Sequence, residues 1–131
     1  MSDSASWVLQ AALAAYLKDR QPKLAVYDDV PDGAAMPYTF IGDDEERNAG
    51  GEGCVASSHQ IQLVVVSSKL GYKECKAIAG TLRDTLDGAA INVPGFNQTD
   101  LTWISTSYRR HPDIATQRMA LIRFDLELHA T

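Results

Sequence analysis

The strongest constraint on the fold is the alternation of apolar and mostly polar residues over the segment 116 to 129. Apolar side chains take every second position through most of it: Ala120, Ile122, Phe124, Leu126 and Leu128, with Leu121, Arg123, Asp125, Glu127 and His129 between them. Because successive side chains of a strand point to opposite faces, this period of two predicts a long strand with one buried face.

A second strand is predicted over residues 59 to 67, "HQIQLVVVS". Every second residue from Ile61 is apolar, and the glutamines between them give way to valines at Val64 and Val66. The far end of this strand is therefore apolar on both faces, which is typical of a central strand that is covered on both sides.

Two helices are predicted, near residues 5 to 18 and 71 to 87, because apolar residues recur there every three or four positions. The first follows Ser4, a favourable N-cap residue. The second begins with a capping box, with Gly71 as the cap and Glu74 three residues later, and it ends at Gly88. The stripes that we expect to be buried are Leu9, Ala12, Leu13, Tyr16 and Leu17 in the first helix and Tyr72, Cys75, Ile78, Ala79, Leu82 and Leu86 in the second.

Shorter strands are predicted at Leu24 to Asp28, Tyr38 to Gly42 and Leu101 to Arg109. In the last of these, Trp103 is placed on one face and Ile104 and Tyr108 on the other, and the preceding "VPGFNQTD" is read as a loop. Short connections favour antiparallel pairing. The sequence therefore predicts a single α+β domain over residues 1–131, a mainly antiparallel β-sheet with two α-helices packed on one face.

Charge and composition argue against several classes of protein. The chain has 12 basic and 17 acidic residues, a net charge of −5, which argues against binding phosphate backbones by counterion release. The longest apolar run, Val8 to Leu17, is well short of the ~20 residues that span a bilayer, so no membrane segment is predicted. The start lacks the features of a secretion signal and only two cysteines occur, so we expect synthesis in the cytoplasm with reduced thiols.

Residues 43 to 53, "DDEERNAGGEG", combine charge with glycine and offer almost no apolar area to bury. This composition predicts a flexible acidic loop that would be ordered by contact with a partner. Five carboxylates and one guanidinium give the loop a net charge of −4: Asp43, Asp44, Glu45, Glu46 and Glu52 against Arg47.

No motif for catalysis or for cofactor binding is evident. Ser105, Ser107, His111 and Asp113 lie close in sequence, but neither serine sits in a nucleophile-elbow motif. The cysteines and histidines lack zinc-site spacing, and the acidic run lacks calcium-loop spacing. We therefore predict no catalytic residue, no metal ligand and no cofactor. One enzymatic alternative stays open, a small metal-dependent hydrolase. Its ligands would be Cys54, His59 and the carboxylates of "DDEE".

The order of several short motifs resembles a family of small phage tail-component proteins related to the tail terminators of long-tailed phages, found also in gene transfer agents. The motifs are an N-terminal helix rich in Ala and Leu, "VYDDVP" at 26–31, "MPYTFIG" at 36–42 with the acidic loop after it, "IQLVVVSS" running into "GYKECKAI", and "HPD" before the final strand. Two departures are the absence of an aromatic residue near Val66 and Ile114 in place of a glycine.

This resemblance implies a structural virion protein in the tail-neck region and no enzyme activity. It implies a ring, usually of six copies, at the head-proximal end of the tail tube, where it stops tube polymerisation and docks the head. The implied partners are other copies of the chain, the tail tube protein and a head-completion or adaptor protein, and DNA passes through the ring without specific binding. The runner-up is a head-to-tail adaptor in the neck.

A ring interface is heterologous, so each subunit needs two different, complementary patches. The candidates for these patches are the outward side chains of the last strand and the loop ends near Met36 and Trp103. The acidic segment 43–53 is expected either to meet a basic rim on the tube or to line the lumen, where its charge would repel DNA. The predicted interaction residues are Asp43, Asp44, Glu45, Glu46, Arg47, Glu52, Leu121 and Arg123.

Overall fold

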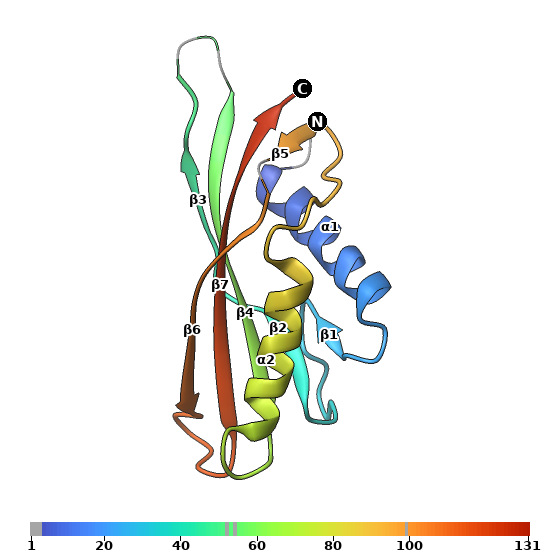
Figure 1. The fold of residues 1–131 in the computed structure, drawn as a ribbon, viewed down its shortest axis with the longest axis vertical. Helices are drawn as coiled ribbons and strands as arrows, with labels where there is room; N and C mark the ends of the chain where they lie inside the picture. Colours follow the sequence, from blue (N-terminus) through green and yellow to red (C-terminus); the bar gives the residue numbers. More distant parts are fainter. Residues whose placement is uncertain (1–3, 52, 54, 99) are drawn as a thin grey trace.

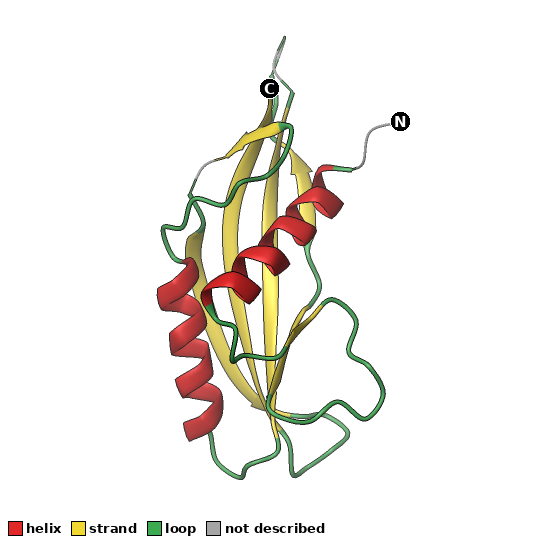
Figure 2. Ribbon diagram, turned by 90° about the vertical axis from the view of Figure 1, so that its right-hand side faces the viewer, coloured by secondary structure: helices red, strands yellow, loops and turns green. Residues whose placement is uncertain are grey.

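Two helices pack against one side of a twisted sheet in the computed structural model, which describes residues 4–51, 53, 55–98 and 100–131 (Figure 1). The elements in chain order are α1 (Ala5–Arg20), β1 (Val26–Tyr27), β2 (Tyr38–Ile41), β3 (Glu45–Asn48), β4 (Ala56–Ser67), α2 (Lys73–Leu86), β5 (Phe96–Gln98), β6 (Thr102–Arg110) and β7 (Arg118–Ala130). Figure 2 shows both helices in front of the same face of the sheet. The predicted α+β class, with both helices on one face, is confirmed.

The two strands with the clearest sequence patterns, β4 and β7, form the centre of the sheet. They pair antiparallel over their whole length, from Ala56 opposite His129 to Ser67 opposite Arg118. β2 and β3 pair with the other edge of β4, and β5 and β6 with the other edge of β7. Within the described residues, seven strands form one sheet, in which only β1 and β2 run parallel.

Helix α1 forms where the sequence predicts it. The Ser4 side chain accepts a hydrogen bond from the backbone N–H of Trp7 at 3.2 Å, which satisfies one of the otherwise unpaired amides of the first turn. Leu9, Leu13 and Leu17 follow at four-residue steps and are buried against the sheet. Burial of each such side chain stabilises the fold by about 1.5–3 kcal/mol.

Helix α2 confirms the predicted stripe but not the predicted cap. Its buried residues are Cys75, Ala79, Leu82 and Leu86. Gly71 has φ +80° and lies outside the helix, and Tyr72 is the N-cap without a side-chain capping bond. The capping box is therefore wrong, because the Glu74 carboxylate instead accepts a hydrogen bond from the Ser67 hydroxyl at 2.5 Å. Gly88, with φ +79°, follows the helix end as predicted.

The helix-facing side of the sheet carries the core. The alternate residues of β7 from Ala120 to Leu128 are all buried there, as predicted. Val64 and Val66 point away from the helices and are nevertheless only 5% and 3% exposed. Val64 is covered by its cross-strand neighbours, Phe40 of β2 and Leu121 of β7. The end of β4 is thus buried on both faces, on one of them by neighbouring side chains rather than by a further layer.

Two predicted loops contain strands. Glu45–Asn48 forms β3, which pairs antiparallel with the residues from Ser57 to Gln60 of β4, so segment 43–53 is not a structureless loop throughout. All four β3 side chains are exposed. The sequence did not predict β3 because the strand is held by backbone hydrogen bonds to β4, which require no apolar side chain. In addition, β4 begins at Ala56, three residues before its predicted start. Phe96–Gln98, also predicted as loop, pairs with the end of β7 as β5.

A β-bulge in β6 changes the orientation of an aromatic residue. The register shifts between Trp103 and Ser105, because Ile104 is an extra residue on this strand. Residues beyond the bulge change face, so Tyr108 lies on the helix-facing side, with its ring centroid 6.2 Å from that of Tyr72. The prediction that Trp103 and Tyr108 lie on opposite faces is therefore wrong.

Candidate interaction surfaces

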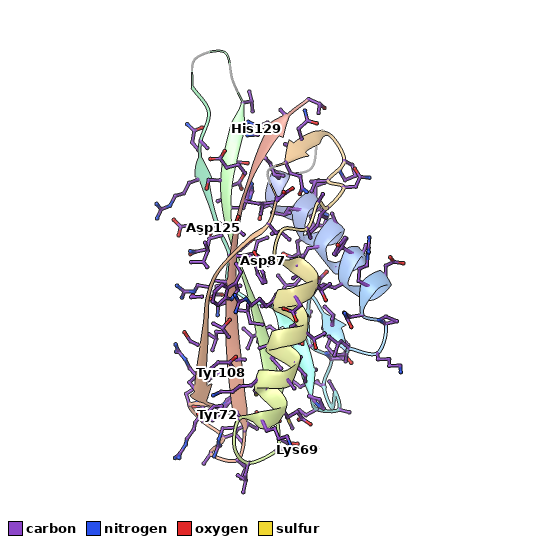
Figure 3. All side chains as sticks on the ribbon, in the orientation of Figure 1. Lys69, Tyr72, Asp87, Tyr108, Asp125 and His129 are labelled. Carbon is purple, nitrogen blue, oxygen red and sulfur yellow. The ribbon has the colours of Figure 1, made fainter. Side chains whose placement is uncertain are left out.

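The side of the sheet away from the helices, here called the outer face, is the first candidate surface. On β4 and β7, Gln60 lies opposite Asp125 and Gln62 opposite Arg123, and all four belong to this face because the residues between them point into the core. Figure 3 shows Asp125 and His129 on the half of β7 that lies beside β3. This half of the outer face is polar.

Two neighbouring hollows mark the polar half. One, of about 190 Å³, is lined by Asp43, Asp44, Glu45, Gln60, Gln62 and Arg123. The other, of about 170 Å³, is lined by Glu45, Arg47, Ser58, Gln60 and Asp125. Arg47 Nε lies 2.5 Å from Glu45 Oε1, and this bond raises the pKa of the guanidinium, which keeps its charge. The hollows therefore expose a mixed surface in which carboxylates outnumber guanidinium groups.

The structure brings five of the eight predicted interaction residues to these hollows: Asp43, Asp44, Glu45, Arg47 and Arg123. Because side chains alternate along β3, Glu46 lies on the helix-facing side of the sheet, where it is the cross-strand partner of His59. Leu121 is on the outer face, as predicted, but in its apolar half, opposite Val64. Glu52 lies outside the described residues.

The apolar half of the outer face contains residues that the sequence did not single out. Tyr38 and Phe40 of β2 and Tyr27 of β1 lie there, with ring centroids 6.2 Å apart for Tyr27 and Tyr38 and 6.4 Å apart for Tyr38 and Phe40. Met119 and Leu121 continue this surface across β7, and all five are partly exposed. The alternation in "YTFI" could have indicated that Tyr38 and Phe40 share one face of the strand. Which residues of the other strands lie beside them could be known only from the register of the sheet.

A third hollow lies between the exposed face of α1 and the loop before β5. It has a volume of about 730 Å³ and a mainly apolar lining, including Trp7, Ala11, Ala15, Pro94 and Phe96. Trp7 is 52% exposed, so a large part of its ring faces solvent. An exposed apolar surface of this kind is typical of a site of protein contact.

Among the ligand candidates of the alternative hydrolase that lie in the described residues, His59 is the one that is buried, at 2% exposure. Its Nε2 lies 2.7 Å from the Ser57 hydroxyl. Burial lowers the pKa of His59, and the nearby carboxylates of Glu46 and Asp44 oppose this shift only in part. The imidazole is therefore neutral at pH 7, and the Ser57 contact satisfies one of its nitrogens in the core.

The other candidates for chemistry are separated. Within the described residues, no group of three or more His, Cys, Asp or Glu side chains is arranged to hold a metal ion, and Cys54 lies outside them. Cys75 is buried, which raises the pKa of its thiol. His111 Nδ1 accepts hydrogen bonds from the backbone amides of Asp113 and Ile114, both at 3.1 Å. These hydrogen bonds lie within the turn that contains "HPD", so His111 has a structural role there.

No helix of the described chain has the length and apolarity needed to cross a membrane.

Comparison with known proteins identifies the family. The model of the family "Tail completion protein gp17" matches residues 8–125, which is most of the chain. A chain in a solved structure described as "Virion of native gene transfer agent (GTA) particle" has the same fold, with a TM-score of 0.87 at 24% sequence identity. The similarity covers 98% of this chain and 100% of that one. No curated protein matches the sequence.

The family match includes both helices and most of the sheet, and it confirms the resemblance to phage tail components. The chain therefore belongs to the tail completion protein gp17 family and is a structural tail component of a virion.

Proposed function

We propose that the protein forms a ring at the head-proximal end of the tail tube, where it ends tube polymerisation and presents a docking face to the head. The observation that carries this proposal is the match to a tail completion family over residues 8–125. The similarity to a chain of a gene transfer agent virion supports a particle of the phage or gene transfer agent type. The role is structural and requires no catalytic step.

The outer face supports assembly because it exposes two surfaces of different chemistry side by side. One half is charged and hollowed, and the other is apolar and aromatic. A heterologous ring needs two different patches on every subunit, and further surface for the tube and the head. Aromatic residues at the centre of a patch with charged residues around it are typical of protein interfaces.

Segment 43–53 belongs to the proposed tube contact. Its charged residues Asp43 and Glu45 lie at a hollow of the outer face, and β3 gives them a fixed position. Carboxylates placed in this way favour a basic surface on the tube, and they also repel DNA that passes through the ring. Contact with the tube is the role that we favour, because a hairpin that projects from the sheet is accessible to a large partner (Figure 1).

Electron microscopy of purified tails tests the position. We expect density for this chain at one end of the tube, and tails of uncontrolled length when the gene is deleted. Density along the whole tube would contradict a terminating role. Density on the head side of the joint, with normal tail length in the deletion strain, would instead identify an adaptor of the neck.

A further inference from the structure

Five exposed cations gather at the end of the molecule where β4 leads into α2 and β6 turns into β7. They are Lys69, Lys73, Lys76, Arg109 and Arg110, here called the basic end. Residues 68–76 and 108–114, which form this end, contain only two carboxylates, Glu74 and Asp113. The connection between β4 and α2, the first turns of α2 and the end of β6 meet at one end of the long axis, opposite the β3–β4 hairpin (Figure 1). The basic end is thus a positive region on a chain of net charge −5.

Large apolar and aromatic side chains are interleaved with these cations. Leu70 is 74% exposed, Ile114 44% and Tyr108 37%. The Lys76 ammonium lies 5.0 Å from the centroid of the Tyr108 ring, which in turn packs edge-on against Tyr72. Figure 3 shows Lys69, Tyr72 and Tyr108 together at this end. Exposed apolar side chains surrounded by charged ones are typical of a protein interface. A phosphate backbone would bind the cations but would make no apolar contact with Leu70 or Ile114.

The complement of this surface is present on the same chain. The hollows of the outer face carry four carboxylates, Asp43, Asp44, Glu45 and Asp125, against two guanidinium groups, Arg47, which pairs with Glu45, and Arg123. They lie at the level of Gln60, and the basic end begins beyond Ser67, so about 23 Å of strand separates the two at ~3.3 Å per residue. One copy cannot bring its own two surfaces together. Arg109 and Arg110 make no ion pair with any residue in the described ranges.

We propose that the basic end of one copy docks on the acidic hollows of the next, with Leu70 and Ile114 as apolar anchors and with Arg109 and the neighbouring cations facing Asp43 and Glu45. The contact joins two different surfaces, so it is heterologous and closes into a ring when the rotation between copies closes. This inference rests on the proposed ring and assigns its subunit interface, and it gives Asp43 and Glu45 to the neighbouring copy in place of the tube contact. Opposite charges across the contact also fix the order and orientation of the copies.

Cross-linking in assembled particles tests the contact directly. Asp43→Cys and Arg110→Cys are combined in a Cys54→Ser background, in which the remaining Cys75 is buried, and purified particles are treated with a flexible bismaleimide. We expect a ladder of covalently linked copies on a denaturing gel. The control pair is Asp43→Cys with Lys23→Cys, because Lys23 is exposed on the connection that follows α1. A ladder no stronger than that of the control overturns the proposal.

Charge reversal in purified full-length protein gives an independent test. Arg109→Glu/Arg110→Glu and Asp43→Lys/Glu45→Lys should each weaken self-association by about tenfold or more, as loss of facing charge pairs does. Mixing the two variants should restore association, because each then meets a complementary surface. Lys18→Glu/Lys23→Glu, an equal change of charge on exposed residues elsewhere, should have little effect. Failure of the mixture to associate where the native protein does overturns the contact.

The outcomes separate this inference from the proposed function. Normal placement at the tube end without the ladder would refute the interface and leave the terminator role intact. A ladder together with density away from the tube end would support the interface and refute that role. Retention of duplex DNA at physiological salt that is lost in Arg109→Glu/Arg110→Glu would show that the basic end serves a polyanion, and would also overturn the proposal.

Discussion

Single residues show where sequence patterns predict burial well and where they do not. The leucines of both helices are buried as expected, since helical spacing alone assigns them to one face. The sequence suggested His59 as a metal ligand of the alternative hydrolase, yet it is buried beside Ser57. The period of two places His59 on the same face as Ile61 and Leu63, so the alternation could have indicated its burial, but the polar side chain obscured the pattern.

Stability should depend on pH through His59. Burial lowers the pKa of the His59 imidazole in the folded protein below its value of ~6.5 in the unfolded chain. At pH values near and below ~6.5 the unfolded chain therefore binds more protons than the folded protein. The contribution of His59 to stability is therefore complete above that value and is lost as the pH falls below it. Urea unfolding between pH 7.5 and 5 should show a steeper decline for the native chain than for His59→Gln. Equal slopes would contradict the inferred state of the imidazole.

Leu82 tests the core between α2 and the sheet. Its side chain is fully buried, so Leu82→Ala leaves a cavity and should lower the free energy of unfolding by about 2–5 kcal/mol. Asp84→Ala, two residues along on the exposed side of the same helix, should change it by about 0.5 kcal/mol or less. Chemical denaturation measures both. A loss below 1 kcal/mol for Leu82→Ala would mean that α2 is not packed as described.

At the scale of elements, the sequence predicted those whose stability comes from burying a periodic apolar face. Both helices and the strands β2, β4 and β7 have such a pattern, and they were predicted to within a few residues. β6 was also predicted from its alternation, although it is exposed or only partly buried along its length. β3 and β5 are held by pairing with longer strands and carry no periodic signal. The bulge at Ile104 was missed for a related reason, since an extra residue interrupts the alternation without changing its composition.

The pairing of β3 can be tested by removing one donor at its end. The Ala49 N–H donates to the Ala56 carbonyl at 3.1 Å, and Ala49→Pro removes this bond. Amide hydrogen exchange of residues 45–48 should be slow in the native chain and markedly faster in the variant. Global stability should fall by only about 0.5–1.5 kcal/mol, because one exposed hydrogen bond is lost. Equally fast exchange in both proteins would show that the segment is unpaired.

At the scale of the molecule, the fold was largely predictable from the sequence and the candidate surfaces were only partly so. The acidic segment was recognised from its charge, and Arg123 from its outward position on β7. Their meeting at one hollow depends on the register of β3, β4 and β7, which no local pattern contains. The basic end was missed because its cations come from segments that are separated by about thirty residues and meet only in the folded chain.

The charge of the acidic segment, rather than its shape, should matter for assembly. Asp43→Asn, Asp44→Asn and Glu45→Gln keep the size of the side chains and the pairing of β3, and they remove three negative charges from the hollows of the outer face. Exposed substitutions of this kind should change the free energy of unfolding by about 1 kcal/mol or less. The charges contribute to contact with basic partner surfaces, so the triple variant should give fewer particles with joined heads and tails of controlled length.

Particle counts and tail lengths by electron microscopy measure this effect. The matched control is Asp28→Asn/Asp29→Asn/Asp32→Asn, which removes three exposed carboxylates of another loop. Normal, infectious or transducing particles from the triple variant would show that these carboxylates serve only solvation.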